Sequence, residues 1–261
     1  GREAPRPAAP RLPRVVLALL LALPLGGCGG TWAWHVVDPT DPRGWTNLSF
    51  LLSGLWPAVV LSVTAMALSV SLGLAVALAG FSPFRPVRAA ARVWVEVFRS
   101  VPILVALLWV FYGLPVVADI RLGIFAAAVI AIALSDSAFE AEIFRAGIQS
   151  VERTQREAAM ALGLSPWQRF RFVIFPQALR RVLPPLGNQF VYVVKMSSLA
   201  SVIGYEELTR RANELTVTVF RPLEIYTVLV LEYLALVLVI SWAVRRMERR
   251  LGADQTLRRE G

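Results

Sequence analysis

Ionisable side chains interrupt several of the long apolar stretches of this chain. Asp136 and Glu140 fall in the second half of one stretch, Lys195 lies about midway along the next, and Glu232 lies about midway along the last. An ionisable side chain at the bilayer centre costs at least about 2.5–3.5 kcal/mol, so it is usually paired or faces an aqueous path. Because Asp136 and Glu140 are four residues apart, we expect them to share one face of a helix.

Two interpretations of these charges follow from their chemistry. In the first, the acids line a solute path and meet an ammonium group or another cation. In the second, they form a structural network in which Lys195 pairs with Asp136 or Glu232, and Glu142 pairs with a loop arginine. Ser197 and Ser198 could line the same path or bond back to helix carbonyl groups. The candidates for the path are therefore Asp136, Glu140, Lys195, Ser197, Ser198 and Glu232.

The elements that must position these residues are membrane-spanning helices. The chain has 261 residues, of which 56% are hydrophobic, and this excludes a disordered protein and favours a polytopic membrane protein. Stretches of about 20 apolar residues can cross the hydrocarbon core of a bilayer. We expect an all-α fold with about five spans, at residues 57–81, 101–117, 123–144, 186–205 and 223–244. Residues 82–100 are expected to form a loop.

The arginines predict the orientation of these spans. The net charge of +9 comes from 26 arginines and a single lysine, and the arginines cluster in short segments beside apolar stretches. Membrane orientation explains that pattern better than nucleic-acid binding does. Segments 82–100, 145–185 and 245–261 hold 17 arginines, whereas 31–56, 118–122 and 206–222 hold 5. The loop at 145–185 and the basic tail at 249–261 are thus expected in the cytoplasm, and residues 29–53 outside.

Residues 1–28 have the character of a targeting segment. Four arginines precede a short apolar run at 15–27, which is the length of a signal-peptide core. Cys28 follows a Leu-Gly-Gly sequence that resembles a lipoprotein cleavage site. An uncleaved signal anchor and a misassigned start codon are equal alternatives. A single cysteine excludes a disulfide framework within the chain, and no spacing of ligands indicates a metal site.

The loop between the third and fourth spans is itself built like a folded element. Residues 157–162 are strongly helix-forming, and Gly163 stands where a helix ends in the left-handed region. Ser165 is expected to cap a second helix, with Pro166 in its first turn and Gln168 completing a capping box. This predicts a helix–turn–helix ending near Ile174. An amphipathic hairpin on the lipid surface is the alternative.

These motifs resemble those of a known family. The Glu-Ala-Ala sequence with Gly163 resembles the EAA loop of ABC-type import permeases, and the similarity covers about residues 54–251. Residues 95–102 (VEVFRSVP), 138–148 (AFEAEIFRAGI) and 175–180 (FPQALR) are similar to signatures of the permeases for polar amino acids. Residues 195–199 (KMSSL) resemble "KDSSL", with Met196 in place of the aspartate. Glu232 adds an acid where the family usually has an apolar residue, so we expect it to balance Lys195.

The resemblance implies a type I ABC importer transmembrane domain at residues 54–248, with a coupling loop at 150–176. Glu157, Ala158, Ala159 and Gly163 would then dock on an ATPase subunit, which would bind ATP and magnesium; no cofactor is expected in this chain. Two permease copies or homologues would form the pathway, and a periplasmic or lipid-anchored amino-acid-binding protein would deliver the solute. The expected location is the cytoplasmic (inner) membrane. Membrane lipid is an expected partner of the chain, and nucleic acid is not.

Two rival classes remain open at this point. An ion-coupled secondary transporter would use the intramembrane charges, although no inverted repeat is evident. A non-transporting membrane scaffold or lipoprotein would be anchored through Cys28, and it would leave those charges without a role. No Gly-x-x-x-x-Gly-Lys-Ser/Thr sequence occurs, so this chain carries no visible P-loop of its own. The resemblance to import permeases implies that this subunit does no covalent chemistry.

Overall fold

A computed structural model describes residues 33–250 of the chain. The chain divides into two units, 1–34 and 35–261, and the second unit contains nearly all of the described residues. The expectations for the apolar run at 15–27, for Cys28 and for the tail beyond residue 250 lie outside the described residues.

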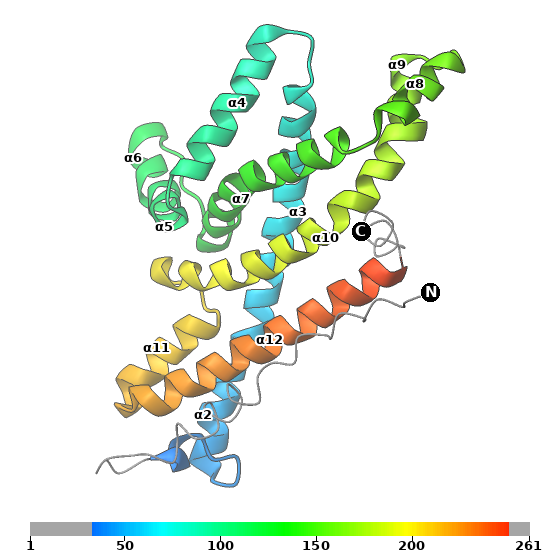
Figure 1. Cartoon of the computed structure of the whole chain (residues 1–261). Helices are drawn as coiled ribbons and strands as arrows, with labels where there is room; N and C mark the ends of the chain where they lie inside the picture. Colours follow the sequence, from blue (N-terminus) through cyan, green and yellow to red (C-terminus); the bar gives the residue numbers. More distant parts are fainter. Residues whose placement is uncertain (1–32, 251–261) are drawn as a thin grey trace, which may run out of the picture. The chain divides into compact units, whose positions relative to one another are not determined.

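The described residues are almost entirely helical and contain no strand, which confirms the all-α expectation (Figure 1). Short 3₁₀ segments lie at Trp34–Val37 and Ser197–Ile203, and π-helical turns at Trp109–Gly113 and Phe170–Ile174. The α-helices are α2 (Pro42–Leu52), α3 (Leu55–Gly80), α4 (Arg85–Ser100), α5 (Ile103–Leu108), α6 (Leu114–Ala118), α7 (Ile124–Gln149), α8 (Arg153–Ala161), α9 (Pro166–Arg169), α10 (Phe175–Met196), α11 (Leu208–Val219) and α12 (Pro222–Arg250).

Three described stretches are long and apolar enough to cross a membrane: Pro42–Gly80, Ile124–Gln149 and Pro222–Arg249. They contain the first, third and fifth expected spans. A bent pair, Arg85–Ser100 with Ile103–Ala118, would be a fourth if it is one span. The remaining expected span falls in α10 and the 3₁₀ segment after it. α10 carries Arg180, Arg181 and Lys195 together with two internal prolines, and it is not among the described helices that are apolar enough to cross a membrane.

The expected loop at 82–100 is instead mostly the helix α4. Pro86 suits its first turn, because amides there have no intrahelical partner. Ala91, Trp94 and Phe98 turn towards the protein, and Nε1 of Trp94 donates a hydrogen bond to Oγ of Ser137 at 3.1 Å. Pro102 then breaks the helix, and the chain bends by 102° into α5. The prediction was wrong because many arginines were taken to mean a loop, whereas their spacing fits one face of a helix.

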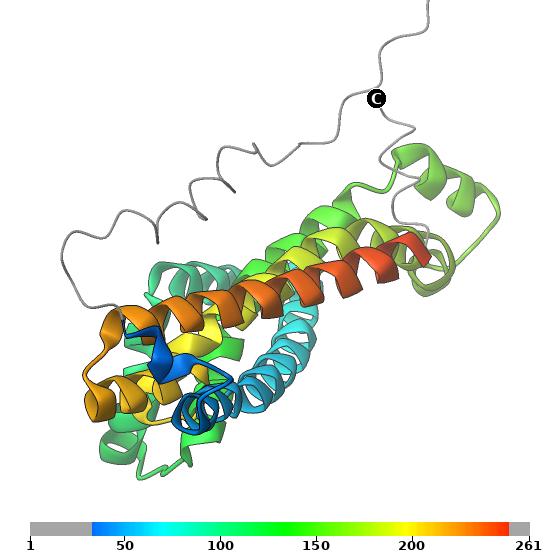
Figure 2. The same cartoon turned by 90° about the horizontal axis from the view of Figure 1, so that it is seen from below.

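The centre of the unit is the contact between α3 and α7. Small residues line the buried face of α3, and Gly73 allows the closest approach: a Cβ added there would lie 2.7 Å from Cβ of Glu140. Leu61, Leu107 and Ile132 are fully or almost fully buried in the largest apolar cluster, which joins α3, α5 and α7. Small residues thus let the two helices approach closely, which suits helices packed within a membrane. α10 packs against both of them, and α12 runs along α10 (Figure 2).

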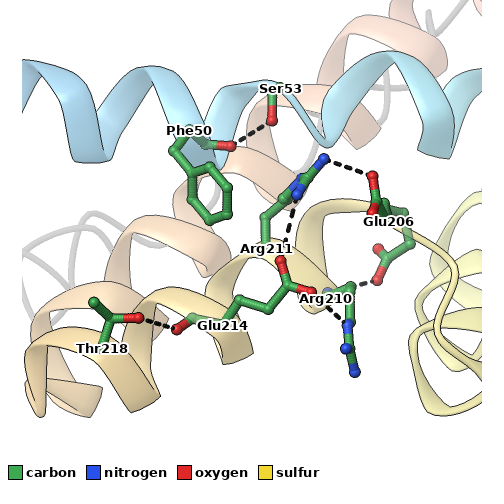
Figure 3. Close-up of polar contacts among 8 residues, drawn as sticks. Phe50, Ser53, Glu206, Arg210, Arg211, Glu214 and Thr218 are labelled. Atoms are coloured by element: carbon green, nitrogen blue, oxygen red, sulfur yellow. Dashed lines mark hydrogen bonds and ion pairs between the residues drawn. The ribbon is translucent and has the colours of Figure 1, made fainter.

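At the end of the unit opposite α8, a cluster of charged residues lies at the start of α11, and one of its arginines stacks on a ring of α2 (Figure 3). The guanidinium of Arg211 bonds to the carboxylates of Glu206 at 2.7 Å and Glu214 at 3.3 Å, and it lies over the ring of Phe50, 4.8 Å from its centroid. Nε of Arg210 donates to Glu214 at 2.7 Å. We call Glu206, Arg210, Arg211 and Glu214 the outer charge cluster. Each charge in it has an opposite charge within bonding distance.

Candidate functional site

Asp136 and Glu140 lie side by side on the face of α7 that meets α3, as their spacing predicts. Asp136 is 3% exposed and Glu140 is not exposed at all. Oγ of Ser69, on α3, lies 3.0 Å from Oδ2 of Asp136 and 2.8 Å from Oε2 of Glu140. Because a serine hydroxyl has one proton, it donates to only one of these oxygens at a time. We call Asp136, Glu140 and Ser69 the acid pair site.

The acid pair has amide and hydroxyl neighbours but no cation. The side-chain amide of Gln189, on α10, donates to Oδ1 of Asp136. Oε1 of Glu140 is buried and has no hydrogen-bond partner among the described residues. No lysine or arginine of the described part of the chain forms an ion pair with either acid. Two buried carboxyl groups without a cation are unfavourable for stability, so their presence favours a role other than holding the fold.

The space beside Asp136 is small in this structure. A cavity of about 10 Å³ lies between Asp136 on α7, Ile103 on α5 and Tyr192 on α10. Such a volume holds one water at most, so an amino acid could reach Asp136 only if these helices separated. Phe139 also lines this cavity, and the guanidinium of Arg99 lies over its ring, 5.3 Å from the centroid. A cation from α4 therefore lies one side chain away from the cavity.

Lys195 does not join the acids. Its side chain is exposed, and within residues 33–250 it forms no ion pair with Asp136 or Glu232. Ser197 is buried and donates to the carbonyl of Val194 at 2.8 Å, and Ser198 donates to the carbonyl of Lys195 at 2.8 Å. Both hydroxyls thus bond back to the helix, which was the structural alternative for them. The structural network built on Lys195 is not formed.

Glu232 is 7% exposed, on the face of α12 that packs towards α3 and α10. Neither of its carboxylate oxygens has a hydrogen-bond partner among the described residues. The expectation that Glu232 balances the charge of Lys195 is therefore wrong. The two residues are on different helices, and no periodicity within one helix could have established how they face each other.

The loop at 150–176 folds as the sequence predicts around its turn. α8 ends at Ala161, Gly163 has a φ of +72°, and α9 starts after Ser165. The capping box forms, since N–H of Gln168 donates to Oγ of Ser165 at 3.3 Å and N–H of Ser165 donates to Oε1 of Gln168 at 2.9 Å. The second helix does not end near Ile174, however. It continues through a π-helical turn into α10, with Pro176 in the first turn.

The four residues that are expected to dock on the ATPase differ in their exposure. Glu157 and Ala158 are exposed, and Nε of Arg153 donates to Glu157 at 2.7 Å. Gly163 is exposed at the turn, with no other atom within 4 Å of an added Cβ. Ala159, in contrast, is 2% exposed and faces its own chain. A partner cannot touch Ala159 directly, so its small size serves the internal packing of the loop.

Contacts to the neighbouring helices hold this loop. Ile148 at the end of α7, Val151 and Ala178 of α10 form a buried cluster, against which Phe170 and Ile174 pack. Nη2 of Arg156 donates to the carbonyl of Ile148 at 2.6 Å. A force applied to α8 and α9 would therefore be transmitted directly to α7 and α10, which also carry Asp136 and Gln189.

Sequence reasoning missed Ser69 and Gln189, the two side chains that form hydrogen bonds with the acids. Neither was predicted to lie beside Asp136 or Glu140. A signal for Ser69 does exist, because Ser62 and Ser69 are polar positions on the face of α3 that is otherwise small and apolar. Gln189 lies four residues after Pro185, in a stretch whose helical periodicity the prolines obscure.

Several known proteins are similar to this chain in sequence and fold. Residues 69–253 match the family described as binding-protein-dependent transport system inner membrane component. The chain is 40% identical over 211 residues to the glutamine transport system permease protein GlnP of Escherichia coli strain K12, covering 79% of this chain and 95% of GlnP. It is 32% identical over 208 residues to the arginine transport system permease protein ArtQ of Bacillus subtilis strain 168, covering 80% and 95%. A crystal structure of an amino acid ABC transporter with histidines is 35% identical, with a TM-score of 0.77, covering 85% and 100%.

Proposed function

Since this chain belongs to the family of binding-protein-dependent transport system inner membrane components, we propose that it carries polar amino acids across the inner membrane as the permease subunit of an ABC importer. Its family works with a separate ATPase and a binding protein, so this chain is the transport component and not the enzyme. The names of its relatives support amino acids as the solute class, and they differ in the amino acid named.

The observation that carries this proposal is the exposed helix–turn–helix of α8 and α9. Met160, Leu162 and Trp167 leave a large apolar surface at its tip, where Leu162 is 79% exposed. Such a surface on an ordered element supports docking of another protein. We propose that Glu157, Ala158 and Gly163 contact the ATPase there, and that Ala159 acts from inside by keeping α8 close to the π-helical turn Phe170–Ile174.

The remaining arrangement follows from the same proposal. Two permease copies or homologues would form the pathway, with α8, α9 and the C-terminus in the cytoplasm and residues 29–53 outside. ATP and magnesium would be bound by the ATPase alone. The amino-acid-binding protein, periplasmic or lipid-anchored, would deliver the solute at the end of the unit that carries α2 and α11.

We further propose that the acid pair site meets the cationic groups of the solute. Asp136 and Glu140 can accept hydrogen bonds from an ammonium group, and such charge-assisted bonds are stronger than neutral ones. Glu232 is a second buried acid without a partner among the described residues. Because the cavity beside Asp136 is small here, opening it would require movement of α5 or α10 against α7, which the coupling loop is placed to drive.

The proposal is tested by co-purification and ATP hydrolysis. The permease would be expressed with its neighbouring ATPase, purified through a tag, and assayed in proteoliposomes with and without amino acids and the binding protein. Leu162→Arg should abolish co-purification of the ATPase. Val217→Arg, at a similarly exposed valine of α11, is the matched control and should leave co-purification intact.

The rival is an ion-coupled secondary transporter that uses the buried acids. It predicts uptake that follows an ion gradient, ignores ATP and survives Leu162→Arg. Uptake of that kind by the permease alone would overturn the importer proposal.

A further inference from the structure

A groove of about 500 Å³ lies between α3, α4 and α7, away from the acid pair. Its walls are apolar and come from the last turns of α3, from α4 and from α7: Val76, Ala77, Phe81, Ala91, Val95 and Ala141. Its volume falls in the range of small-ligand sites, roughly 300–1,000 Å³. Figure 1 shows α3 and α4 diverging from their short connection, with α7 passing across them.

Charged side chains line the same groove. Arg92 and Arg99 come from α4 and Arg145 from α7, together with Glu96 and Glu142. Nη2 of Arg145 is paired with Glu142 at 2.7 Å. Neither Arg92 nor Arg99 has a carboxylate within ion-pair distance in residues 33–250, so the groove presents positive charge that an anion could neutralise.

The arginines of α4 follow the period of the helix. Arg85, Arg88, Arg92 and Arg99 are separated by 3, 4 and 7 residues, so they share one face. Apolar residues occupy other positions of α4, and Val87, Val93 and Val97 are exposed. A helix with basic and apolar faces is typical of a segment at a membrane surface.

The position of the groove indicates which kind of anion could reach its arginines. It begins at the connection between α3 and α4, which the proposed orientation places at the cytoplasmic surface of the membrane; in this respect the inference rests on the proposed function. Anionic phospholipids present phosphate groups at that level and acyl chains just below it. Basic pockets between membrane helices on this side bind such headgroups.

We infer that this groove binds an anionic phospholipid, with its phosphate at Arg92 and Arg99 and one acyl chain along the apolar walls. Arginine suits phosphate because its guanidinium can donate two parallel hydrogen bonds. Arg145 lies on the opposite wall, where it could approach the headgroup if its bond to Glu142 opened.

The test measures lipid binding by the full-length permease, purified with its ATPase in a neutral detergent. Phosphatidylglycerol or phosphatidylcholine is titrated while the melting temperature is followed, and retained lipid is counted by native mass spectrometry. Wild-type protein should be stabilised by phosphatidylglycerol far more than by phosphatidylcholine. Arg92→Gln should raise the apparent Kd for phosphatidylglycerol about tenfold, the loss expected for one charge-assisted contact.

Two further variants keep the test decisive. Arg246→Gln is the control, because it removes one arginine charge outside the groove, on α12, where Arg246 lies over the ring of Trp242. It should bind phosphatidylglycerol as the wild type does. Glu96→Gln removes an acid from the groove and should tighten binding, so a result exists even if Arg92→Gln does not fold.

Equal effects of phosphatidylglycerol on wild type, Arg92→Gln and Arg246→Gln would overturn the inference in favour of general surface attraction. Stabilisation by inorganic phosphate alone would overturn it in favour of a free-anion site. The measurement needs neither ATP nor an amino acid. Failure of the importer proposal would therefore appear as absent ATP-driven uptake with lipid binding intact, and failure of this inference as the reverse.

Discussion

The acid pair site and the outer charge cluster place charges in opposite ways. In the outer cluster, Arg211 lies between Glu206 and Glu214, and every charge has a partner. In the acid pair site, Asp136 and Glu140 share one hydroxyl and one amide, and no cation of the described residues reaches them. The first arrangement is complete within the chain, whereas the second lacks the positive charge that would complete it.

This difference separates structural charges from functional ones. Matched pairs at a partly exposed surface contribute little each, about 0–1 kcal/mol, and here they lie within one segment at the start of α11. Buried acids without a cation are costly, and they are retained where function requires them. The comparison predicts that changes at the acid pair alter transport far more than stability, and that changes in the outer cluster do the opposite.

The largest effect is expected from neutralising the acid pair. Asp136→Asn and Glu140→Gln keep the size of each side chain and replace its ionisable carboxyl group by a neutral amide. Each should lower ATP-driven amino acid uptake in proteoliposomes about 10–100-fold, because a hydrogen bond to a charged group contributes about 1.5–3 kcal/mol. The melting temperature should stay constant or rise. Uptake within twofold of wild type in both variants would end the functional interpretation of the pair.

The next largest effect is expected from Gly73→Ala, which should lower the stability of the protein. The added Cβ would lie 2.7 Å from Cβ of Glu140 and 3.0 Å from the carbonyl of Ser137, so α3 and α7 must move apart. Overpacking of this kind costs about 1–3 kcal/mol. Thermal unfolding in detergent measures it. Gly80→Ala is the control, because no heavy atom of the described residues lies within 4 Å of its added Cβ, and it should not destabilise the protein.

Arg211→Gln tests the outer charge cluster, where a substitution should change stability more than transport. It leaves Glu206 without this partner and removes one of two partners of Glu214, and it also removes the contact with Phe50. The loss of stability should be about 1 kcal/mol, since the side chains are partly solvated. Uptake should change less than twofold. A tenfold loss of uptake with unchanged stability would show that the outer cluster takes part in transport.

The smallest effect concerns Glu207, which caps α11 and is fully buried beside the outer cluster. Burial raises the pKa of Glu207 above its ordinary value of 4.5, although hydrogen bonds from Tyr233 and from N–H of Thr209 and Arg210 oppose the shift. The folded state then holds the proton more tightly than the unfolded state. Stability should therefore fall as pH rises from 4.5 through the raised pKa. Glu207→Gln should remove this part of the pH dependence of the melting temperature, whereas an unchanged profile would assign it to another group.

Local features of the fold could be predicted from the sequence, whereas contacts between helices could not. The turn at Gly163, the cap at Ser165 and the shared face of Asp136 and Glu140 follow from spacing within a few residues. The path of α4 was missed because arginine content was weighed above periodicity. Ala159 shows the same limit, since a small residue in a docking motif may face either the partner or its own helix neighbours, and only the packing of α8 decides.

The sequence predicts the two carboxylates of the acid pair site but not the residues that contact them. The two carboxylates belong to one helix, so their proximity follows from helical geometry. Ser69 and Gln189 come from two other helices, 67 and 53 residues away from Asp136 in the chain. The pairing of Lys195 with Glu232 failed for the same reason, because it required knowing which faces of α10 and α12 meet.

The most direct test is equilibrium binding of radiolabelled amino acids to the purified permease–ATPase complex without the binding protein. Glutamine, arginine and histidine would be compared on wild type, on the Asp136→Asn, Glu140→Gln double variant and on Arg211→Gln. The account predicts saturable binding of at least one of them to wild type and to Arg211→Gln, and none to the double variant. Equal binding by the double variant and wild type would contradict the assignment of the acid pair to the solute path.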